Sequence, residues 1–208
     1  NIYYLKNLPP ELKTVLSYTN EGKLAKADHI CRDYLQRKPH DVEAMRLLAK
    51  IALELYIFED AEFLLESCLV FDPNNIKVKH DYITTLLRRQ KYGLALKTAK
   101  ELYETSPEEL VAMKLYATTL FRADIYDESI NLFETVLQIE PRNTDVMLTM
   151  GHLYKTDGQI EKSIDSYTSA FSMDKYFGDA YWSLANLKTY KFNEKQIKSL
   201  QEMVNDEF

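Results

Sequence analysis

The segment PEELVAMKLYATTLFRADIYDESINLFETVLQIEP, residues 107–141, runs from one proline to the next over an interval of 34 residues. The same interval separates Pro39 from Pro73 and Pro73 from Pro107, and one further step from Pro141 reaches Lys175. Self-similarity at a fixed period of about 20 to 50 residues is the mark of a protein built from repeated structural units. The proline spacing therefore predicts a repeat array with a period of 34 residues.

Two positions of the repeat hold mostly small residues. With each proline as position 32, repeats begin near residues 8, 42, 76, 110, 144 and 178. Position 20 then holds Ala27, Ala61, Ala95, Ser129 and Ser163, and position 8 holds Val15, Ala49, Ile83, Ala117, Gly151 and Ala185. Because small side chains let two antiparallel helices approach closely, each unit is predicted to be a helix–turn–helix.

Residues around the prolines predict where the helices begin and end. Proline lacks a backbone donor and disfavours helical geometry at the residue before it, so the second helix of each unit should stop there. Candidate N-caps of the following helices are Asp41, Asn75, and Asn143 or Thr144. The segment Ser106–Glu109 resembles a capping box with Pro107 at the first helical position, which predicts a helix start at that point.

The chain is expected to form one repeat array with distinct ends. A single unit cannot bury its apolar face alone, so stacking must supply a continuous core over residues 8–192. Residues 1–7 are interpreted as the end of a preceding helix or a linker. Residues 193–208 are predicted to be a capping helix, because Asn193 and Gln196 resemble a capping box. The helix carries a one-sided apolar stripe of Ile197, Leu200, Met203 and Val204.

The repeat resembles the tetratricopeptide repeat family over residues 8–192. The fifth unit carries the resemblance best, through Gly151, Tyr154, Gly158, Ser163, Tyr167 and Ala170. The resemblance implies an all-α fold, a right-handed α-α superhelix of about six helical pairs with a C-terminal capping helix. It also implies a protein–protein interaction scaffold whose concave groove holds a peptide or protein segment.

Composition excludes several functional classes. The 5 glycines cannot form either of the glycine-rich loops that bind dinucleotides or nucleotide phosphates. Residues 105–208 carry 10 basic and 17 acidic side chains, which argues against nucleic acid as a partner. No apolar run approaches the length of a membrane span. The two cysteines, Cys31 and Cys68, are predicted to be buried thiols, which is typical of a protein in a reducing, cytoplasmic compartment. Since the chain begins with Asn rather than Met, we expect a fragment of a longer protein.

No catalytic or metal-binding constellation is present in the sequence. The 4 histidines, at positions 29, 40, 80 and 152, do not occur at metal-ligand spacing, and no HExxH, CxxC or GxSxG motif occurs. We therefore predict no catalytic residues, no metal and no cofactor. The tyrosines at repeat positions, Tyr82, Tyr116, Tyr154 and Tyr167, are predicted to pack in the core.

The family resemblance implies that positions 5, 9, 12 and 13 of each first helix line the concave groove. In repeats 2 to 5 the candidate groove residues are Arg46, Lys50, His80, Thr84, Arg88, Lys114, Thr118, Arg122, His152 and Lys155. Clustered positive charge would attract anionic ligands, so the groove between repeats 2 and 4 is hypothesised to bind an acidic segment. The alternative is a solvated face whose charges are balanced by neighbours such as Asp81.

The segment Gly178–Phe192 carries a narrower resemblance. Together with Gly151–Gly158 it resembles the repeats that precede the catalytic domain of bacterial tetratricopeptide-repeat sulfotransferases. This implies a parent enzyme that uses phosphoadenosine phosphosulfate, with its catalytic domain after Phe208; a stand-alone adaptor or co-chaperone-like protein is the alternative. Trp182 and Asn186 would then contact a bound segment or the downstream domain, although packing of Trp182 against residues 194–206 is the favoured role. The oligomeric state is left open.

Overall fold

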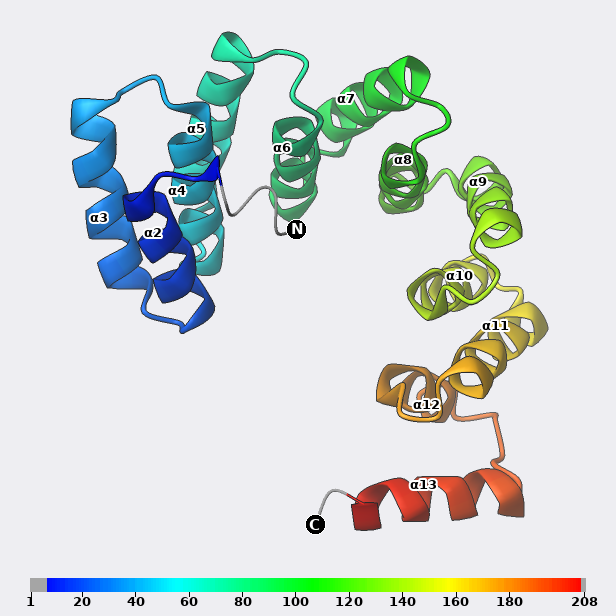
Figure 1. Ribbon diagram of the computed structural model, residues 1–208. Helices are drawn as coiled ribbons and strands as arrows, with labels where there is room; N and C mark the ends of the chain where they lie inside the picture. Colours follow the sequence, from blue (N-terminus) through cyan, green and yellow to red (C-terminus); the bar gives the residue numbers. More distant parts are fainter. Residues whose placement is uncertain (1–6, 207–208) are drawn as a thin grey trace. The chain divides into compact units, whose positions relative to one another are not determined.

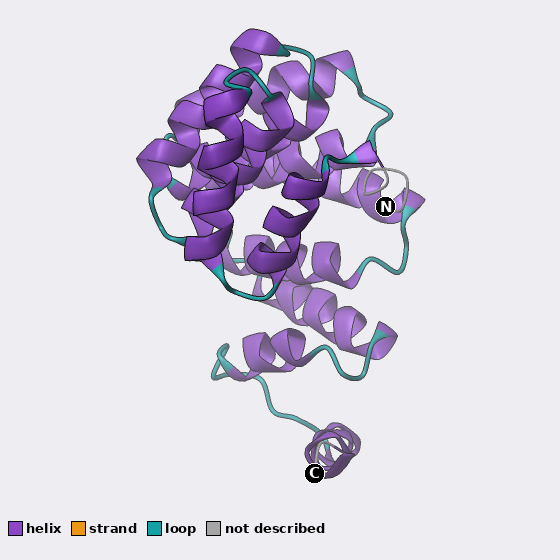
Figure 2. Ribbon diagram, turned by 60° about the vertical axis from the view of Figure 1, so that its left-hand side comes forward, coloured by secondary structure: helices purple, strands orange, loops and turns teal. Residues whose placement is uncertain are grey.

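The computed structural model describes the backbone of residues 7–206 and side chains as far as residue 202. Every regular element in this range is a helix (Figure 2). The first helices of successive repeats are α2 (Pro10–Asn20), α4 (Val42–Glu54), α6 (Ile76–Arg88), α8 (Leu110–Arg122), α10 (Thr144–Thr156) and α12 (Gly178–Ala185) (Figure 1). The second helices are α3 (Leu24–Arg37), α5 (Phe58–Phe71), α7 (Tyr92–Thr105), α9 (Tyr126–Ile139), α11 (Ile160–Met173) and α13 (Glu194–Asp206).

Helix starts recur at the interval of the proline spacing. The first helices from α4 to α12 begin at the residues where the frame places the repeat starts, and all second helices follow the same period. The exception is α2, which begins at Pro10 because Pro9 precedes it and Pro10 fits the first helical position. Apart from Asn7, the segment interpreted as a preceding helix end or linker lies outside the described residues.

The chain divides into two compact units, residues 1–123 and residues 124–208. In the first unit, helices α2 to α8 pack in chain order, and the first helices also contact one another, α2 with α4, α4 with α6, and α6 with α8. In the second unit, α10 packs between α9 and α11, and α11 also packs against α12. The first unit is therefore a stack of helical hairpins that ends with α8, and in the second unit α9 to α12 pack in chain order.

The predicted helix ends before proline are confirmed. The residue before each proline terminates the preceding second helix, at Lys38, Asp72, Ser106 and Glu140. Asp174 ends α11 in the same way although Lys175 follows it. Proline is thus not necessary for the stop. Where Lys175 replaces it, the side chain of Asp174 accepts from the backbone N–H of Tyr176 at 2.9 Å, and the next helix, α12, has no side-chain cap.

Three of the predicted N-caps are confirmed. A side-chain oxygen of Asp41 accepts a hydrogen bond from the backbone N–H of Ala44 at 2.9 Å. Asn75 caps α6 in the same manner, and Asn143, not Thr144, caps α10. These bonds satisfy backbone donors that the first turn of a helix leaves unpaired.

The predicted capping box at Ser106 is wrong. Helix α8 begins at Leu110, and its N-cap Glu109 makes no side-chain capping bond. Ser106 instead ends α7, because its backbone N–H bonds to the carbonyls of Leu102 and Tyr103. The carbonyl of Ser106 accepts from the N–H of Glu109 at 3.1 Å, so Pro107 lies in a turn and not at the first position of a helix.

The turn within each of the first five repeats contains a residue with positive φ. These residues, all at repeat position 15, are Gly22, Tyr56, Gln90, Asp124 and Gly158, with φ between 59° and 81°. The next backbone N–H closes the turn, as Ile57 does on the carbonyl of Ala52 at 2.8 Å. This is the Schellman closure of a helix end, which glycine adopts without strain and other residues adopt at a cost.

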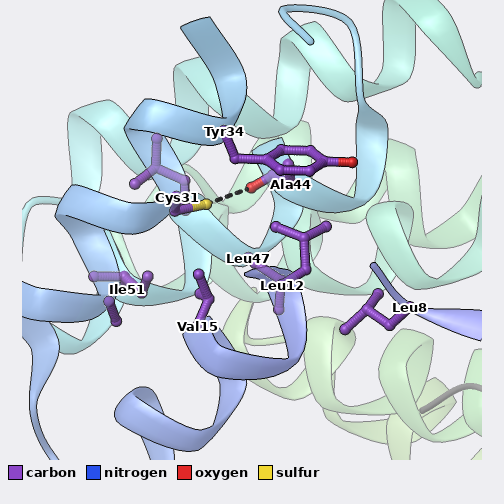
Figure 3. Packing of buried hydrophobic residues seen from close by; sticks show 10 residues of the cluster. Leu8, Leu12, Val15, Cys31, Tyr34, Ala44, Leu47 and Ile51 are labelled. Carbon is purple, nitrogen blue, oxygen red and sulfur yellow. Dashed lines mark hydrogen bonds between the residues drawn. The ribbon is translucent and has the colours of Figure 1, made fainter. Parts of the chain in front are cut away.

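The predicted core residues are buried. All five residues at position 20 are fully buried. Of the four repeat tyrosines, Tyr167 is fully buried and the other three are nearly so. In the N-terminal cluster, Leu12, Val15, Cys31 and Ile51 meet between α2, α3 and α4 (Figure 3). The thiol of Cys31 donates to the carbonyl of Ala44 at 3.2 Å, and burial raises the pKa of this thiol to about 12. It is a core side chain and not a reactive one.

The last repeat differs from the others. Helix α12 ends at Ala185. Helix α13 begins where the second helix of a sixth repeat is expected, so the predicted capping helix and that second helix are the same element. The predicted box at its start is confirmed, since Asn193 and Gln196 each accept from the other's backbone N–H, at 2.9 and 3.0 Å. Leu200 packs on the neighbouring cluster, whereas Ile197 is exposed. The side chains of Met203 and Val204 lie outside the described residues.

Candidate partner-binding face

Helices α4, α6 and α8 present one common surface in the first unit. Residues four apart on a helix lie on the same side, so positions 5, 9 and 13 of each helix share a face. The contacts of α4 with α6 and of α6 with α8 bring these three faces together. The first-helix face consists of Arg46, Lys50, Glu54, His80, Thr84, Arg88, Lys114, Thr118 and Arg122.

Arg46 is held by two carboxylates. Its guanidinium contacts Glu43 at 2.7 Å and Asp81 at 2.8 Å, and its side chain is only 16% exposed. Burial works to lower the pKa of Arg46, but the hydrogen bonds and charges of Glu43 and Asp81 outweigh it and raise that pKa. Nδ1 of His80 lies 3.3 Å from the other oxygen of Asp81. Arg46 therefore links α4 to α6, and its guanidinium is already paired with carboxylates of the chain itself.

Three other cations of the face are exposed. Lys50, Arg88 and Arg122 lie in solvent, and none of them forms an ion pair with a residue that the structure describes. Lys114 is partly buried. Of the two alternatives left by the sequence, charge balanced by neighbours occurs at Arg46, and anion binding by the exposed cations stays a prediction. Charge is neutralised at Arg46 and remains available at Lys50 and at the ends of α6 and α8.

The hydroxyls of the face are used within their own helices. Thr84 donates to the carbonyl of His80 at 2.9 Å, and Thr118 donates to the carbonyl of Lys114 at 2.8 Å. Each hydroxyl oxygen can still accept a hydrogen bond from a ligand. The face therefore offers charged donors at its exposed cations and acceptors between them, with Glu54 as the acidic exception.

His152 and Lys155 belong to the second unit. His152 packs edge-on against Tyr167, with its Nδ1 2.8 Å from the phenol oxygen. Burial lowers the pKa of this imidazole, and the charge of Lys155 lowers it further. His152 is thus a packing residue that is neutral near pH 7, whereas Lys155 is exposed.

The favoured packing role of Trp182 is wrong. Its side chain is 68% exposed, and Asn186 on the same helix is exposed as well. The neighbouring aromatic residue takes the buried place, since Tyr181 stacks on Phe171 with ring centroids 4.5 Å apart. Two adjacent residues on a helix point in different directions, so only one of this pair can face the core. Contact of Trp182 and Asn186 with a partner stays a prediction.

A pocket of about 280 Å³ in the second unit was not indicated by the sequence. Leu137, Met147, Met150 and Tyr154 form its apolar side, and Lys162 lies at its rim with its ammonium 5.3 Å from the Tyr154 ring centroid. Its lining comes from three helices, α9 to α11, so no single sequence motif marks it.

The described part of the chain shows neither a metal site nor a membrane-spanning helix. Among the side chains of residues 7–202, no group of three or more His, Cys, Asp or Glu is placed to hold a metal ion. Within the same range, no helix combines the length and the apolar character that crossing a bilayer requires.

Residues 144–177 match the family model of the tetratricopeptide repeat. This match supports the predicted resemblance to the tetratricopeptide-repeat family. A comparison with curated protein sequences finds no significant match. Neither the family match nor the similar structures support a sulfotransferase parent, and that part of the resemblance stays a prediction.

Solved structures agree with a tetratricopeptide-type fold. A structure of MamA, residues 41 to the end, from Desulfovibrio magneticus RS-1 superposes with a TM-score of 0.69 at 13% identity, over 80% of this chain and 94% of that chain. YrrB gives 0.64 at 17% identity, over 84% and 90%. MamA MSR-1 gives 0.63 at 22% identity, over 79% and 95%. At these identities the likeness shows the fold alone, and it confirms the all-helical, α-α superhelical class.

Proposed function

We propose that the chain is a protein–protein interaction scaffold that holds an acidic peptide or protein segment against the first-helix face. The observation that carries this proposal is the presence of three exposed cations, Lys50, Arg88 and Arg122, that have no carboxylate partner among the described residues. They stand on adjacent helices of a protein whose net charge is −6. Such a cluster is not needed for solubility, and it attracts carboxylates or phosphates.

The partly buried ion pairs of Arg46 supply the rigidity that such a face needs. Because Arg46 joins Glu43 on α4 to Asp81 on α6, it fixes the two helices relative to each other before any ligand arrives. A preorganised surface loses less conformational freedom on binding. The similar protein YrrB is described as a TPR protein with an unusual peptide-binding site, and the shared fold makes a peptide the ligand class that we favour here.

The proposal is tested with a fluorescein-labelled decamer of glutamate and a variant that removes the three charges. In fluorescence anisotropy, the wild-type chain should bind the glutamate decamer, and K50Q/R88Q/R122Q should bind it at least about tenfold more weakly, since each exposed charge contributes about 0.5 kcal/mol or more. Affinity should also fall as salt is added, because exposed charges are screened.

The matched control removes three exposed lysines from second helices of the same unit. K26Q/K97Q/K100Q changes the net charge equally and should leave binding of the glutamate decamer unchanged. Equal affinities of the two triple variants would show that net charge, and not the first-helix face, determines binding. The proposal would then be wrong.

The finer assignments rest on sequence alone. We propose that the partner is either a separate protein or a downstream domain of the same chain, in the cytoplasm. The resemblance of Gly178–Phe192 to sulfotransferase-associated repeats favours a parent enzyme, and a stand-alone adaptor is the alternative. The gene sequence after Phe208 decides between them. A phosphate-binding loop within the next hundred or so residues would favour the enzyme, since such loops cradle phosphate through backbone N–H groups.

A further inference from the structure

The second repeat differs from the other repeats at its turn and on the solvent side of its second helix. Its turn, Leu55-Tyr56-Ile57, has no charged side chain, whereas the equivalent triplet of each of the other four complete repeats has at least one. The differences continue at positions 22 and 29. Repeat 2 has Phe63 and Val70 there, where the others have His29, Lys97, Asn131 and Asp165 at position 22 and Gln36, Glu104, Gln138 and Ser172 at position 29.

Positions 22 and 29 are exposed in each of the first five repeats, so packing does not explain the apolar side chains of Phe63 and Val70. Phe63 is 67% exposed and Val70 is 78% exposed, and both lie on one side of α5 because seven residues make nearly two helical turns. Tyr56 is 77% exposed and its ring meets that of Phe58 edge-on at 6.0 Å. We call Leu55, Tyr56, Ile57, Phe63 and Val70 the α5 face.

Tyr56 also adopts a backbone conformation that is unfavourable for a residue with a side chain and so lowers the stability of the fold. Its φ is 61°, in the left-handed region where the equivalent residues Gly22 and Gly158 stand without strain. A tyrosine in this conformation destabilises the fold relative to glycine, and its exposed ring does not offset that by burial. Strained, exposed aromatic residues are typical of binding sites.

The surroundings of the α5 face are acidic. Helix α5 contains four carboxylates and no lysine or arginine. Two of them, Glu59 and Glu62, are paired with Arg89 or Lys91. The other two, Asp60 and Glu66, are exposed, and neither forms an ion pair with a described residue, although Glu66 accepts from the hydroxyl of Tyr82 at 2.9 Å. A partner that covers this apolar surface would therefore gain from positive charges beside its apolar residues.

We propose that the α5 face is a second docking surface, separate from the first-helix face, and that it binds an amphipathic helix whose apolar side is flanked by lysine or arginine. The apolar side of such a helix would cover Phe63 and Val70 along the roughly 21 Å length of α5. Its basic flanks would lie against Asp60 and Glu66, and Tyr56 would contact one end.

The test uses two designed 14-residue peptides with leucine at helical spacing, one with lysine and one with glutamate at the remaining positions. In fluorescence anisotropy, the wild-type chain should bind the lysine peptide at least about tenfold more tightly than the glutamate peptide. F63N/V70Q gives repeat 2 the residues that repeat 4 has at Asn131 and Gln138, so it should fold, and it should lose about tenfold or more in affinity for the lysine peptide.

Two further variants separate the docking role from folding and from the first-helix face. Tyr56→Gly should weaken lysine-peptide binding while raising the midpoint of thermal unfolding, a combination that a structural role would not produce. K50Q/R88Q/R122Q should bind the lysine peptide like wild type, so failure of the proposed function and failure of this inference are distinguishable.

The control is I139Q, which removes another exposed apolar side chain, on α9, and should not change lysine-peptide binding. Wild-type affinity of F63N/V70Q for the lysine peptide, or equal affinity of K50Q/R88Q/R122Q for both peptides, would overturn the inference. It would also be overturned if sedimentation showed a wild-type dimer that F63N/V70Q dissociates, because a second copy of the chain would then be the occupant of the α5 face.

Discussion

The ring of Tyr167 occupies the space that a Cβ atom on Gly151 would need. A Cβ built on Gly151 would lie 2.9 Å from Cζ of that ring and closer still to Cε1 and Cδ1. Tyr167 is fully buried, and the hydroxyl of Ser163 donates to the carbonyl of Gly151 at 2.8 Å beside it. Glycine on α10 therefore lets α11 pack directly on the helix backbone, closer than two ordinary side chains would allow.

Replacing Gly151 with alanine should destabilise the second unit. Alanine in a helix gains about 1 kcal/mol over glycine, but forcing a methyl group against a fully buried ring costs about 1–3 kcal/mol and shifts the backbone. Because Tyr167 is fully buried, we expect a net loss of up to about 2 kcal/mol. Urea denaturation followed by far-UV circular dichroism measures the change.

Gly93→Ala is the matched control. Gly93 lies near the start of α7, and a Cβ there would meet no atom within 4 Å. The same substitution should therefore stabilise the chain by about 0.5 kcal/mol through helix propensity alone. If Gly151→Ala were also stabilising, the close contact with the Tyr167 ring would not exist in solution.

The sequence predicted those parts of the fold that depend on backbone chemistry. A proline stops a helix through its own ring, and Asp41, Asn75 and Asn143 cap helices through bonds three residues away or less, so neither depends on distant contacts. The Ser106–Glu109 motif did not form a capping box because the backbone N–H of Ser106, which the box would use, bonds to carbonyls at the end of α7. A local motif cannot indicate which of two helices will use it.

The candidate site was predicted less completely, for a similar reason. Periodicity placed Arg46 and Arg88 on one face, but the distance from Arg46 to Asp81 depends on how α6 packs on α4. For Trp182, the sequence offered two adjacent aromatic residues and no means of choosing the buried one. The α5 face was missed because exposure at Phe63 and Val70 becomes visible only once the helices are paired.

Positive φ at repeat position 15 predicts opposite effects of two reciprocal substitutions. Gln90 has φ 59°, so Gln90→Gly should remove strain of about 1 kcal/mol and raise stability. Gly158 has φ 81° and open space around its Cα, so Gly158→Ala should lower stability by about the same amount through the backbone alone. Thermal unfolding measures both, and changes of the same sign would contradict this account of the turn.

Loss of the buried carboxylate of Glu62 should destabilise the first unit. Its side chain is 7% exposed and contacts Arg89 at 2.7 Å and Lys91 at 2.6 Å, which ties α5 to the α6–α7 turn. Glu62→Gln keeps the volume and removes the charge. The cost should be about 2 kcal/mol, below that of a fully buried pair because both cations can regain water.

The neighbouring pair provides a control for Glu62. Glu59 is 73% exposed and contacts the same guanidinium of Arg89 at 2.9 Å. Glu59→Gln should change the free energy of unfolding by no more than about 0.5 kcal/mol, since exposed ion pairs contribute little. Similar losses in the two variants, measured by urea denaturation, would show that burial of Glu62 does not matter.

Protonation of His152 should weaken the second unit as pH falls. Burial, then the charge of Lys155, lowers the pKa of His152 in the folded chain below its ordinary value of 6.5, while the charge of Asp179 opposes the shift more weakly. The unfolded chain therefore binds a proton first as pH falls. The stabilising contribution of neutral His152 is complete above about pH 6.5 and is lost as pH falls through the lowered folded-state pKa.

His152→Gln isolates this effect from that of the carboxylates. Glutamine does not titrate, and its amide can keep a hydrogen bond to the Tyr167 hydroxyl. The stability difference between wild type and the variant should thus be constant above about pH 6.5 and shift in favour of the variant below it. Chemical denaturation across pH 5 to 8 measures this difference. A difference that stays level through the whole range would mean that the His152 pKa is the same in the folded and unfolded chains, in which case its packing against Tyr167 carries no electrostatic cost.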